Sequence, residues 1–329
     1  MMTSSAIGPP PVPPRRVLCI GAAVLDTLFR VRSLPMGQGK ILPYEMLQVA
    51  EGMASSAAFA VARLGGHASL WGAVGDDATG ERILSDLGDS GIDTSGMTVV
   101  QGARSAISTI LIDDEGERLI VPFYDQRLHD TVRPVTEREI SAFDAVLVDV
   151  RWPKLALRAL IAAGKTGKPA ILDGDVAGEG VIEMLAPAAS HMVFSQPAAE
   201  RLAGTADLVE SVGLLKRKFE HAFISVTAGE NGSLWFDDQS GDIRHLDAPK
   251  VRAIDTLAAG DIFHGAFALA MAEGMPIEET MRLSSMAAAL KCQVFGGRIG
   301  APTRAQVCDA LREWNVRGFK KVSDIELNR

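Results

Sequence analysis

Short apolar runs alternate with helix-like segments along most of the 329-residue chain, and this pattern predicts an α/β fold. Strands are expected at 17–21, 68–74, 145–150, 170–173, 192–195, 222–227 and 233–236. Helical segments are expected at 57–64, 81–90, 155–164 and 206–220. Such alternation indicates a mostly parallel central sheet flanked by helices, with right-handed crossovers. We see no linker or internal repeat that would divide the chain.

Two segments, 29–49 and 105–124, depart from this alternation. The first carries Pro35, Gly37 and Pro43 between short apolar groups, which favours an irregular hairpin over a helix. The second has the turn sequence 113–116 between two apolar runs, which is typical of a β-hairpin. We expect the two hairpins to pair into a small β lid or to form a dimer contact.

The segment 254–267 is the strongest candidate for chemistry. Ile262, Ala266 and Leu269 keep the spacing of a buried helix face, so a helix is expected to begin at Asp261. The small residues just before it, Ala258, Ala259 and Gly260, would let a ligand approach backbone N–H groups. This combination predicts an anion site at a helix N-terminus.

Asp261 lies in the first turn of this predicted helix. A carboxylate there could take a proton from an alcohol while the nearby N–H groups hold a phosphoryl group. Gly265, four residues on, is expected to leave that carboxylate unobstructed. The alternative is an ordinary acidic helix cap, because Asp is common near helix N-termini.

Charge and cysteine content narrow the function class. The formal net charge of −8 argues against a general nucleic-acid or membrane-surface binder. Cys19, Cys292 and Cys308 form no CxxC pair, so we expect neither a disulfide framework nor a zinc site, and a reducing cytoplasm as the compartment. Residues 1–15 are Pro-rich without a signal-peptide core and are expected to be a disordered tail, and 316–329 a charged tail.

Three polar residues are candidates for substrate binding. Asp26 follows the first strand, and Arg151 follows the strand 145–150, so both are expected near the carboxyl ends of the strands, where α/β sheets bind ligands. Asp26 could bind the hydroxyl groups of a sugar, and the alternative is an ordinary turn residue. Arg151 could bind a phosphate or sulfonate group, and the alternative is an ion pair on the surface. Lys40 follows Gly39 as in a P-loop, but the leading glycine is absent, so that motif is rejected. Lys40 remains either a cation over the pocket or a solvated surface lysine.

Taken together, these residues resemble the ribokinase-like, or PfkB, family of carbohydrate kinases, from about residue 16 to 315. The segment 255–261, Asp-Thr-Leu-Ala-Ala-Gly-Asp, is similar to the family signature D-T-x-G-A-G-D. The resemblance implies a three-layer α/β sandwich with a β lid. It also implies that Asp261 is the base and that the amides of Ala258, Ala259 and Gly260 form the anion hole.

The same resemblance extends to other segments. On the sugar side it implies roles for Asp26, Gly52, Ser56 and Asp255, and Val74-Gly75-Asp76-Asp77 resembles the family's V-G-x-D turn. On the nucleotide side it implies ATP contacts at Thr227, Gly229, Gly232, Ala288, Lys291, Cys292 and Gly297. Within the family, segments such as 149–152 and 263–266 resemble those of sulfofructose kinases, which would make Lys40 and Arg151 a sulfonate-binding pair.

Several positions depart from the family pattern, among them Ser56, where the family has an asparagine. Glu51 stands where the first glycine of a Gly-Gly pair is expected, and Pro122 where the sulfonate pocket would have an asparagine. The N-x-x-E motif is replaced by the sequence at 195–198, so the metal ligands stay undetermined. Ala258 replaces a signature glycine, which would cost roughly 1 kcal/mol if the backbone there has a positive φ.

The sequence therefore predicts an ATP- and Mg²⁺-dependent sugar kinase, with a further monovalent cation such as K⁺ as an open question. The expected acceptor is a small sugar, with an anionic ketose that carries phosphate or sulfonate as one candidate. A nucleoside kinase of the same fold and a catalytically weak ligand-sensing protein are the alternatives. The expected partners are the sugar, ATP and a second copy bound through the β lid, without nucleic acid or membrane.

Overall fold

The computed structural model describes residues 8, 13–37, 39–130, 132–314 and 320–321. The two predicted tails, 1–15 and 316–329, fall largely outside these residues. The strands are β1 (Arg16–Ile20), β2 (Val24–Arg30), β3 (Glu45–Glu51), β4 (His67–Trp71), β5 (Ala73–Gly75), β6 (Thr98–Val100), β7 (Ala106–Ile112), β8 (Arg118–Phe123), β9 (Ala145–Val148), β10 (Ala170–Gly174), β11 (His191–Ser195), β12 (Phe223–Thr227), β13 (Ser233–Asp237), β14 (Asp242–Leu246) and β15 (Lys320–Lys321). The α-helices are α1 (Met53–Arg63), α2 (Ala78–Asp89), α3 (Glu137–Ile140), α4 (Pro153–Lys165), α5 (Val181–Leu185), α6 (Gln196–Ala203), α7 (Leu208–Lys218), α8 (Ala259–Glu273), α9 (Ile277–Lys291) and α10 (Arg304–Glu313).

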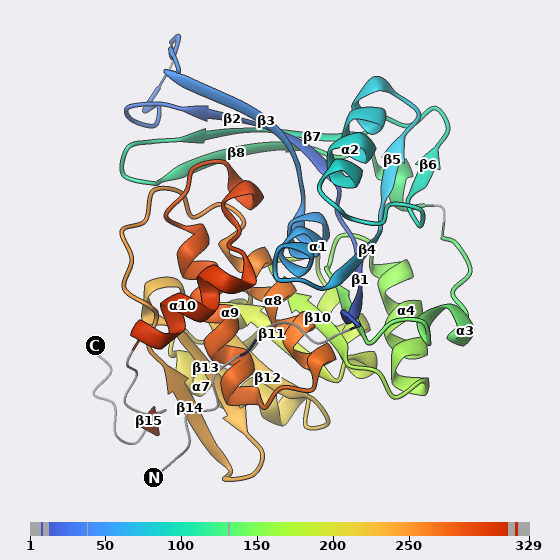
Figure 1. Cartoon of the computed structure of the whole chain (residues 1–329), viewed down its shortest axis with the longest axis vertical. Coiled ribbons are helices and arrows are strands. Elements are labelled where there is room, and N and C mark those ends of the chain that lie inside the picture. The colour runs from blue at the N-terminus through green and yellow to red at the C-terminus, as the bar shows by residue number, and fades with distance from the viewer. Residues whose placement is uncertain (1–7, 9–12, 38, 131, 315–319, 322–329) are drawn as a thin grey trace.

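A nine-stranded sheet forms the centre of the molecule, in the order β15-β14-β13-β12-β11-β10-β9-β1-β4. The strands from β4 to β12 in this order pair in parallel, and β13, β14 and β15 add antiparallel at one edge. Helices cover both faces, with α1, α8, α9 and α10 forming one layer (Figure 1). The predicted three-layer α/β sandwich is confirmed.

Alternation along the central strands separates two hydrophobic cores. In β1, Leu18 and Ile20 pack into the core that includes α4 and α7, whereas Val17 and Cys19 pack into the core that includes α1 and α8. All four side chains are fully buried. Strands covered on both faces are expected to be apolar, as β9 and residues 17–20 of β1 are, so the polar residues that follow them stand out as candidates for a site.

The two predicted hairpins do pair, into a four-stranded sheet of order β3-β2-β7-β8 that projects from the main body (Figure 1). In its register Asp26 of β2 lies opposite Ser108 of β7, which lies opposite Pro122 of β8. Residues opposite one another share a face of a sheet. The lid therefore aligns these three side chains in one row on one face, where Asp26 and Ser108 are buried and Pro122, on the edge strand, is exposed.

The predicted strand 68–74 is interrupted. It divides at Gly72 into β4, which belongs to the central sheet, and β5, which pairs with β6 in a separate two-stranded sheet. A Cβ at Gly72 would lie 2.9 Å from the carbonyl oxygen of Gly21. The close approach of these two backbones explains the break, and the periodicity of the sequence carries no sign of it.

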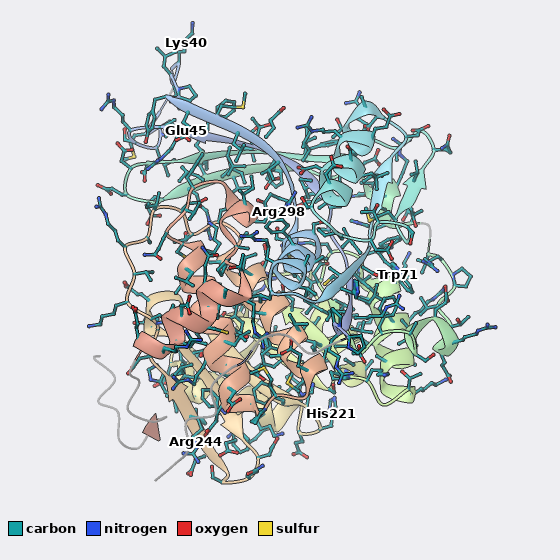
Figure 2. All side chains as sticks on the ribbon, in the orientation of Figure 1. Lys40, Glu45, Trp71, His221, Arg244 and Arg298 are labelled. Carbon is teal, nitrogen blue, oxygen red and sulfur yellow. The ribbon has the colours of Figure 1, made fainter. Side chains whose placement is uncertain are left out.

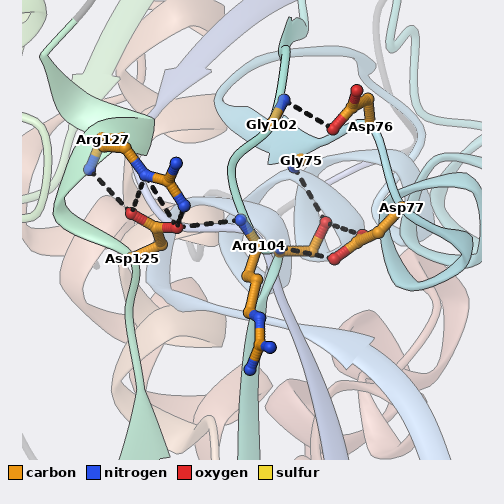
Figure 3. Close-up of polar contacts among 8 residues, drawn as sticks. Gly75, Asp76, Asp77, Gly102, Arg104, Asp125 and Arg127 are labelled. Carbon is orange, nitrogen blue, oxygen red and sulfur yellow. Dashed lines mark hydrogen bonds and ion pairs between the residues drawn. The ribbon is translucent and has the colours of Figure 1, made fainter.

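The V-G-x-D turn between β5 and α2 anchors the second lid hairpin (Figure 3). The Asp77 carboxylate caps α2 by accepting the Gly80 N–H at 2.8 Å, and it also accepts the hydroxyl and N–H of Ser105, just before β7. Asp76 accepts the N–H of Gly102 at 2.8 Å. This turn therefore fixes the start of the strand that carries Ser108.

No helix in the described part of the chain is long and apolar enough to cross a membrane.

Candidate active site

The N-terminus of α8 has the geometry expected of an anion site. Ala258 precedes the helix with φ 61, and it is the one non-glycine residue with positive φ in the described chain. The first helical bond runs from the Ile262 N–H to the Ala258 carbonyl at 2.9 Å, which leaves the N–H groups of Gly260 and Asp261 without a partner in the helix. The Ala259 N–H makes a long turn bond of 3.3 Å to Thr256. The strained backbone thus turns N–H groups outward at a helix end.

Asp261, half-buried in the first turn of α8, has a strongly perturbed carboxyl group. Burial raises its pKa well above the usual value, and the charge of Asp173 raises it further, while His264 lowers it. The His264 imidazole lies 2.7 Å from the Gly260 carbonyl, 3.1 Å from the Val193 carbonyl and 3.4 Å from the Asp173 carboxylate. A raised pKa is typical of a carboxyl group placed to exchange a proton.

The prediction for Gly265 is wrong. A Cβ at this position would collide with the backbone carbonyl of Ala57 in α1, so the glycine allows α8 and α1 to pack closely. Gly265 therefore serves the core beneath the site.

A pocket of about 840 Å³ lies beside the N-terminus of α8. Ala259 and Gly260 line it, together with five of the residues predicted to contact ATP, which are Thr227, Gly229, Gly232, Ala288 and Cys292. Gly232 has φ 84, and a Cβ there would collide with the carbonyl of Leu246, so this turn requires glycine. The volume falls in the range of small-molecule and cofactor sites.

Three predicted ligand contacts lie behind this pocket instead of in its wall. Asp255 is 1% exposed, and its carboxylate accepts the N–H groups of Leu257, Gly296 and Gly297 at 2.8 to 3.0 Å. The Lys291 ammonium lies 3.2 Å from the same carboxylate. Asp255, Lys291 and Gly297 thus hold the loop before α8 from beneath.

Asp26 marks the sugar side of the site. Its carboxylate is 7% exposed and accepts the Ser108 hydroxyl at 2.7 Å. Burial raises its pKa to about 6, and the Ser108 hydrogen bond partly offsets this. A residue that follows β1 in sequence thus lies within β2, on the buried face of the lid.

The segment after β3 is built differently from the prediction. Gly52 has φ 113, and a Cβ there would lie 2.5 Å from the Ala22 carbonyl, so glycine is required for this close approach. Ser56 is fully buried, and its hydroxyl donates to the Glu51 carboxylate at 2.5 Å. Ser56 therefore supports Glu51 and does not face an open cavity.

Arg151 and Lys40, the predicted anion-binding pair, are placed differently. Arg151 follows β9, half-exposed, with its guanidinium 3.6 Å from the Asp175 carboxylate. Lys40 is exposed at the outer end of the β2–β3 hairpin (Figure 2). The structure thus places Arg151 at the carboxyl ends of the strands and Lys40 on the tip of the lid.

Tyr124, just after β8, shows that the candidate groups converge on one site. Burial raises the pKa of Tyr124, the charge of Arg151 lowers it, and the charges of Asp26, Asp149 and Asp261 raise it. Groups from the lid, from the end of β9 and from α8 therefore lie near enough to this phenol for their charges to act on its pKa. The sequence analysis missed Tyr124.

Asp149 is a second residue that the sequence analysis missed. Its buried carboxylate accepts the N–H groups of Ala22, Ala54 and Arg151 at 2.8 to 3.2 Å. It thereby links the end of β1, the start of α1 and the predicted anion-binding arginine. The available signal was its position directly after an apolar strand, the same signal that selected Arg151.

No group of three or more His, Cys, Asp or Glu side chains in the described residues is arranged to hold a metal ion. Asp173 and Asp175 nevertheless lie close enough to Asp261 for their charges to raise its pKa, and the Asp175 carboxylate is partly exposed. This donor set fits a cation that arrives bound to phosphate oxygens and water.

A pocket at a helix N-terminus, with a carboxyl group of raised pKa in the first turn of that helix, is typical of an α/β enzyme that transfers a phosphoryl group to a small molecule. Comparison with known proteins makes this specific. Residues 14–304 match the model of the pfkB family carbohydrate kinases, and the chain belongs to this family. It is a carbohydrate kinase, a phosphotransferase with an alcohol group as acceptor.

Three similar proteins illustrate the relationship. A crystal structure from Agrobacterium tumefaciens, provisionally assigned as a ribokinase, is 63% identical, covers 92% of this chain and 98% of its own, and superposes with a TM-score of 0.90. An ATP-dependent ribose-1-phosphate kinase from Halopiger xanaduensis is 29% identical over 91% of this chain and 98% of its own. The Arabidopsis thaliana ribokinase complexed with ribose and ATP has the same fold, at 24% identity, a TM-score of 0.77, and coverage of 91% of this chain and 99% of its own.

Proposed function

We propose that this protein transfers the γ-phosphoryl group of ATP to a hydroxyl of a small anionic sugar, a ketose that carries phosphate or sulfonate. The observation that carries the proposal is the N-terminus of α8, where Ala259 and Gly260 line a pocket of about 840 Å³ and the Asp261 carboxyl group follows in the first turn of the helix. We assign residues 16–315 to one kinase domain. None of Cys19, Cys292 and Cys308 forms a disulfide, which is compatible with the expected reducing cytoplasm.

The mechanism uses positioning and charge. ATP occupies the pocket beside α8, and the N–H groups of Ala258, Ala259 and Gly260 border the phosphoryl group as it moves. Asp26 and Ser108 of the lid bind sugar hydroxyls. Asp261 accepts the proton of the attacking hydroxyl, and closure of the lid excludes water, which would otherwise compete as acceptor.

Mg²⁺ would be held by the phosphates of ATP, with Asp173 and Asp175 as the nearest protein carboxylates. When bound, the ion neutralises charge on the transferred phosphoryl group. Its positive charge would also lower the pKa of Asp261, because that carboxyl is now raised by neighbouring negative charges. Binding of the nucleotide would thus prepare the base.

Two features support an anionic acceptor. Arg151 lies at the carboxyl ends of the strands and shares the surroundings of Tyr124 with Asp26 and Asp261. The similar protein from Halopiger xanaduensis is described as a ribose-1-phosphate kinase, so an anionic sugar is an acceptor within the relatives. For a sulfonated sugar, Pro122 in the row with Asp26 supplies no hydrogen-bond donor, so Arg151 and a closing Lys40 would carry the recognition.

The test is ADP release with a panel of ribose, fructose, ketose phosphates, sulfofructose and nucleosides. We expect the highest kcat/KM for an anionic sugar, and Asp261→Asn should lower kcat by at least ~10²-fold, as expected for a lost general base. Asp309→Asn on the exposed surface of α10 is the control. A variant Asp261→Asn with near-normal turnover would exclude the assigned base, and a nucleoside as best acceptor would favour the nucleoside-kinase alternative. Absence of ADP release with every acceptor would favour the ligand-sensing alternative.

Arg151→Ala tests recognition of the anion. We expect KM for the anionic sugar to rise at least ~10-fold, and KM for ribose to change little. Arg158→Ala, on the exposed side of α4, is the matched control. Equal effects of Arg151→Ala on charged and neutral sugars would show that this arginine does not recognise the anion.

We also propose that two copies associate through the outer face of the lid. The register places one set of side chains on this face, opposite to Asp26, and the exposed members are mostly apolar: Ile107, Leu119, Val121, Phe123 and Met46. A second lid offers the same apolar surface, so a two-fold pair would cover both. Sedimentation should give a dimer that Val121→Asp dissociates, and a monomeric wild-type chain would contradict the proposal.

A further inference from the structure

A lysine ammonium is enclosed beneath the anion hole. Lys291, the last residue of α9, is 0% exposed. Its Nζ donates to the backbone carbonyl of Asp255 at 2.7 Å and lies 3.2 Å from the carboxylate of the same residue. Removing such a charge from water costs several kcal/mol unless it is closely paired. A buried lysine in this position therefore indicates that the site beside Asp255 requires a positive charge.

The carboxylate beside it organises the loop that leads into α8. Asp255 accepts the Leu257 N–H at 2.8 Å and the N–H groups of Gly296 and Gly297 at 3.0 Å each. Its own N–H donates to the Cys292 carbonyl. The cation that balances Asp255 thus holds together the two loops that border the nucleotide pocket, and it does so next to Ala258, where the backbone is strained.

The ligands of this ammonium are those that a monovalent metal ion would take. A carboxylate oxygen and a backbone carbonyl oxygen are hard donors, which suit K⁺ or Na⁺ as well as an ammonium group. The Lys291 ammonium already occupies the cation side of Asp255, so a second cation does not fit there. This observation bears directly on whether the enzyme needs a monovalent cation, a question that the sequence leaves open.

We propose that the Lys291 ammonium is a built-in monovalent cation for the anion hole, so that phosphoryl transfer needs no added K⁺ or Na⁺. Lys291 is a positioning residue: it acts through Asp255 and its loop. The inference rests on the proposed kinase function, and it concerns how the same site is held in its active shape.

A lysine elsewhere in the fold provides a matched control. Lys216 of α7 donates to the carbonyls of Glu220 and Ala222 at 2.8 and 3.0 Å and pairs with the Asp238 carboxylate at 2.8 Å. Its ligands are thus of the same types, two carbonyls and a carboxylate, but none of them belongs to the loop that leads into α8. Lys216→Ala should lack any cation-specific effect.

The first experiment measures kcat at constant ionic strength in tetramethylammonium, Na⁺, K⁺ and NH₄⁺ chlorides. We expect the wild-type rate to vary less than about 2-fold, and Lys291→Ala to lose roughly 10-fold or more in tetramethylammonium. NH₄⁺ or K⁺ should restore most of the loss, because either fits the vacated position, whereas Lys216→Ala should behave as the wild type. A wild-type enzyme that depends on K⁺, or a loss in Lys291→Ala that is equal in all four salts, would overturn the proposal.

The second experiment separates this inference from the proposed function, because it needs no acceptor. Thermal unfolding is followed for the wild type, Lys291→Ala and Lys291→Met in the same salts. We expect NH₄⁺ or K⁺ to raise the Tm of Lys291→Ala by at least ~2 °C over tetramethylammonium, and to leave the wild type and the space-filling Lys291→Met unchanged. No selective shift would overturn the built-in cation, whatever sugar the enzyme uses.

Discussion

The carboxylate of Glu51 accepts the backbone N–H of Arg298 at 2.7 Å and so joins the base of the lid to the loop behind the nucleotide pocket. The Arg298 guanidinium extends the link, because it donates to the Asp86 carboxylate of α2 at 2.9 Å and to the carbonyl of Ala50. Figure 2 shows Arg298 between the lid and the helices below it. Glu51, a departure from the family pattern, is therefore an internal anchor between the two halves of the site.

The buried carboxyl group of Glu51 should make the stability of the folded chain depend on pH. Burial, and next the charge of Asp26, raise its pKa to about 8 in the folded chain, against an ordinary value of 4.5. The folded state then holds a proton that the unfolded state releases, so the free energy of unfolding falls as the pH rises from 4.5 to 8, by up to ~1.4 kcal/mol per pH unit. Glu51→Gln should flatten this fall, as measured by urea denaturation across the range. Glu45→Gln, on the exposed end of the same strand, is the control, and an unchanged slope in Glu51→Gln would show that Glu51 does not bind the proton.

We expect the substitution Ala258→Gly to stabilise the folded chain. Its φ of 61 lies in the left-handed region, where a Cβ costs roughly 1 kcal/mol and glycine costs little. Ala258→Gly should therefore raise the free energy of unfolding by ~0.5–1 kcal/mol and leave kcat within about 3-fold. Ala305→Gly, at an exposed helical position in α10, should lower stability by a similar amount, and a decrease in both variants would contradict strain at Ala258.

We expect removal of the Asp173 charge to shift the pH profile of the reaction. After burial, its charge is the largest cause of the raised pKa of Asp261. Asp173→Asn should lower the pKa of Asp261, so the acid limb of kcat/KM should move to lower pH. Asp309→Asn should leave the profile in place. A limb that moves to higher pH, or does not move, would show that Asp173 does not set the ionisation of the base.

Periodicity was sufficient to predict the framework, because it depends on local patterns. The apolar runs predicted the central strands, and the helical spacing predicted a helix from Asp261, close to its observed start at Ala259, whereas the anion site there stays a prediction. Helix α8 ends at Glu273, and Gly274 follows it with φ 75, the local pattern of many helix ends. These features depend on residues that are close together in the sequence, so the amino-acid sequence alone is enough to predict them.

The positions that the sequence analysis missed depend on contacts between distant segments. Asp255 lies in the family signature, and only the packing of the loop 292–297 over it shows that its carboxylate is fully occupied. Ser108 joins Asp26 across 82 positions, through the register of two lid strands. Gly265 matched an open helix face, but α1 fills that space. Neither register nor helix packing can be obtained from residue spacing.

We expect substitution of Asp77 to weaken the attachment of the lid strand β7 to the turn before α2. Its carboxylate accepts three donors, the Gly80 N–H at the start of α2 and the hydroxyl and N–H of Ser105 before β7 (Figure 3). Asp77→Ala removes a helix cap and two hydrogen bonds, so we expect a loss of ~2–3 kcal/mol in the free energy of unfolding. Because β7 carries Ser108, the partner of Asp26, KM for the sugar should rise by at least ~3-fold while kcat changes less.

Asp76→Ala is the matched control for this prediction, because Asp76 is the adjacent carboxylate of the same turn. It accepts one exposed N–H, from Gly102, so its loss should cost less than about 1 kcal/mol and leave KM unchanged. The measurements are urea denaturation and steady-state kinetics at saturating ATP. If Asp77→Ala lowered stability but left KM at the wild-type value, the turn would support the fold without positioning the lid. If the two variants behaved alike, the contacts of Ser105 would contribute nothing beyond those of an exposed turn.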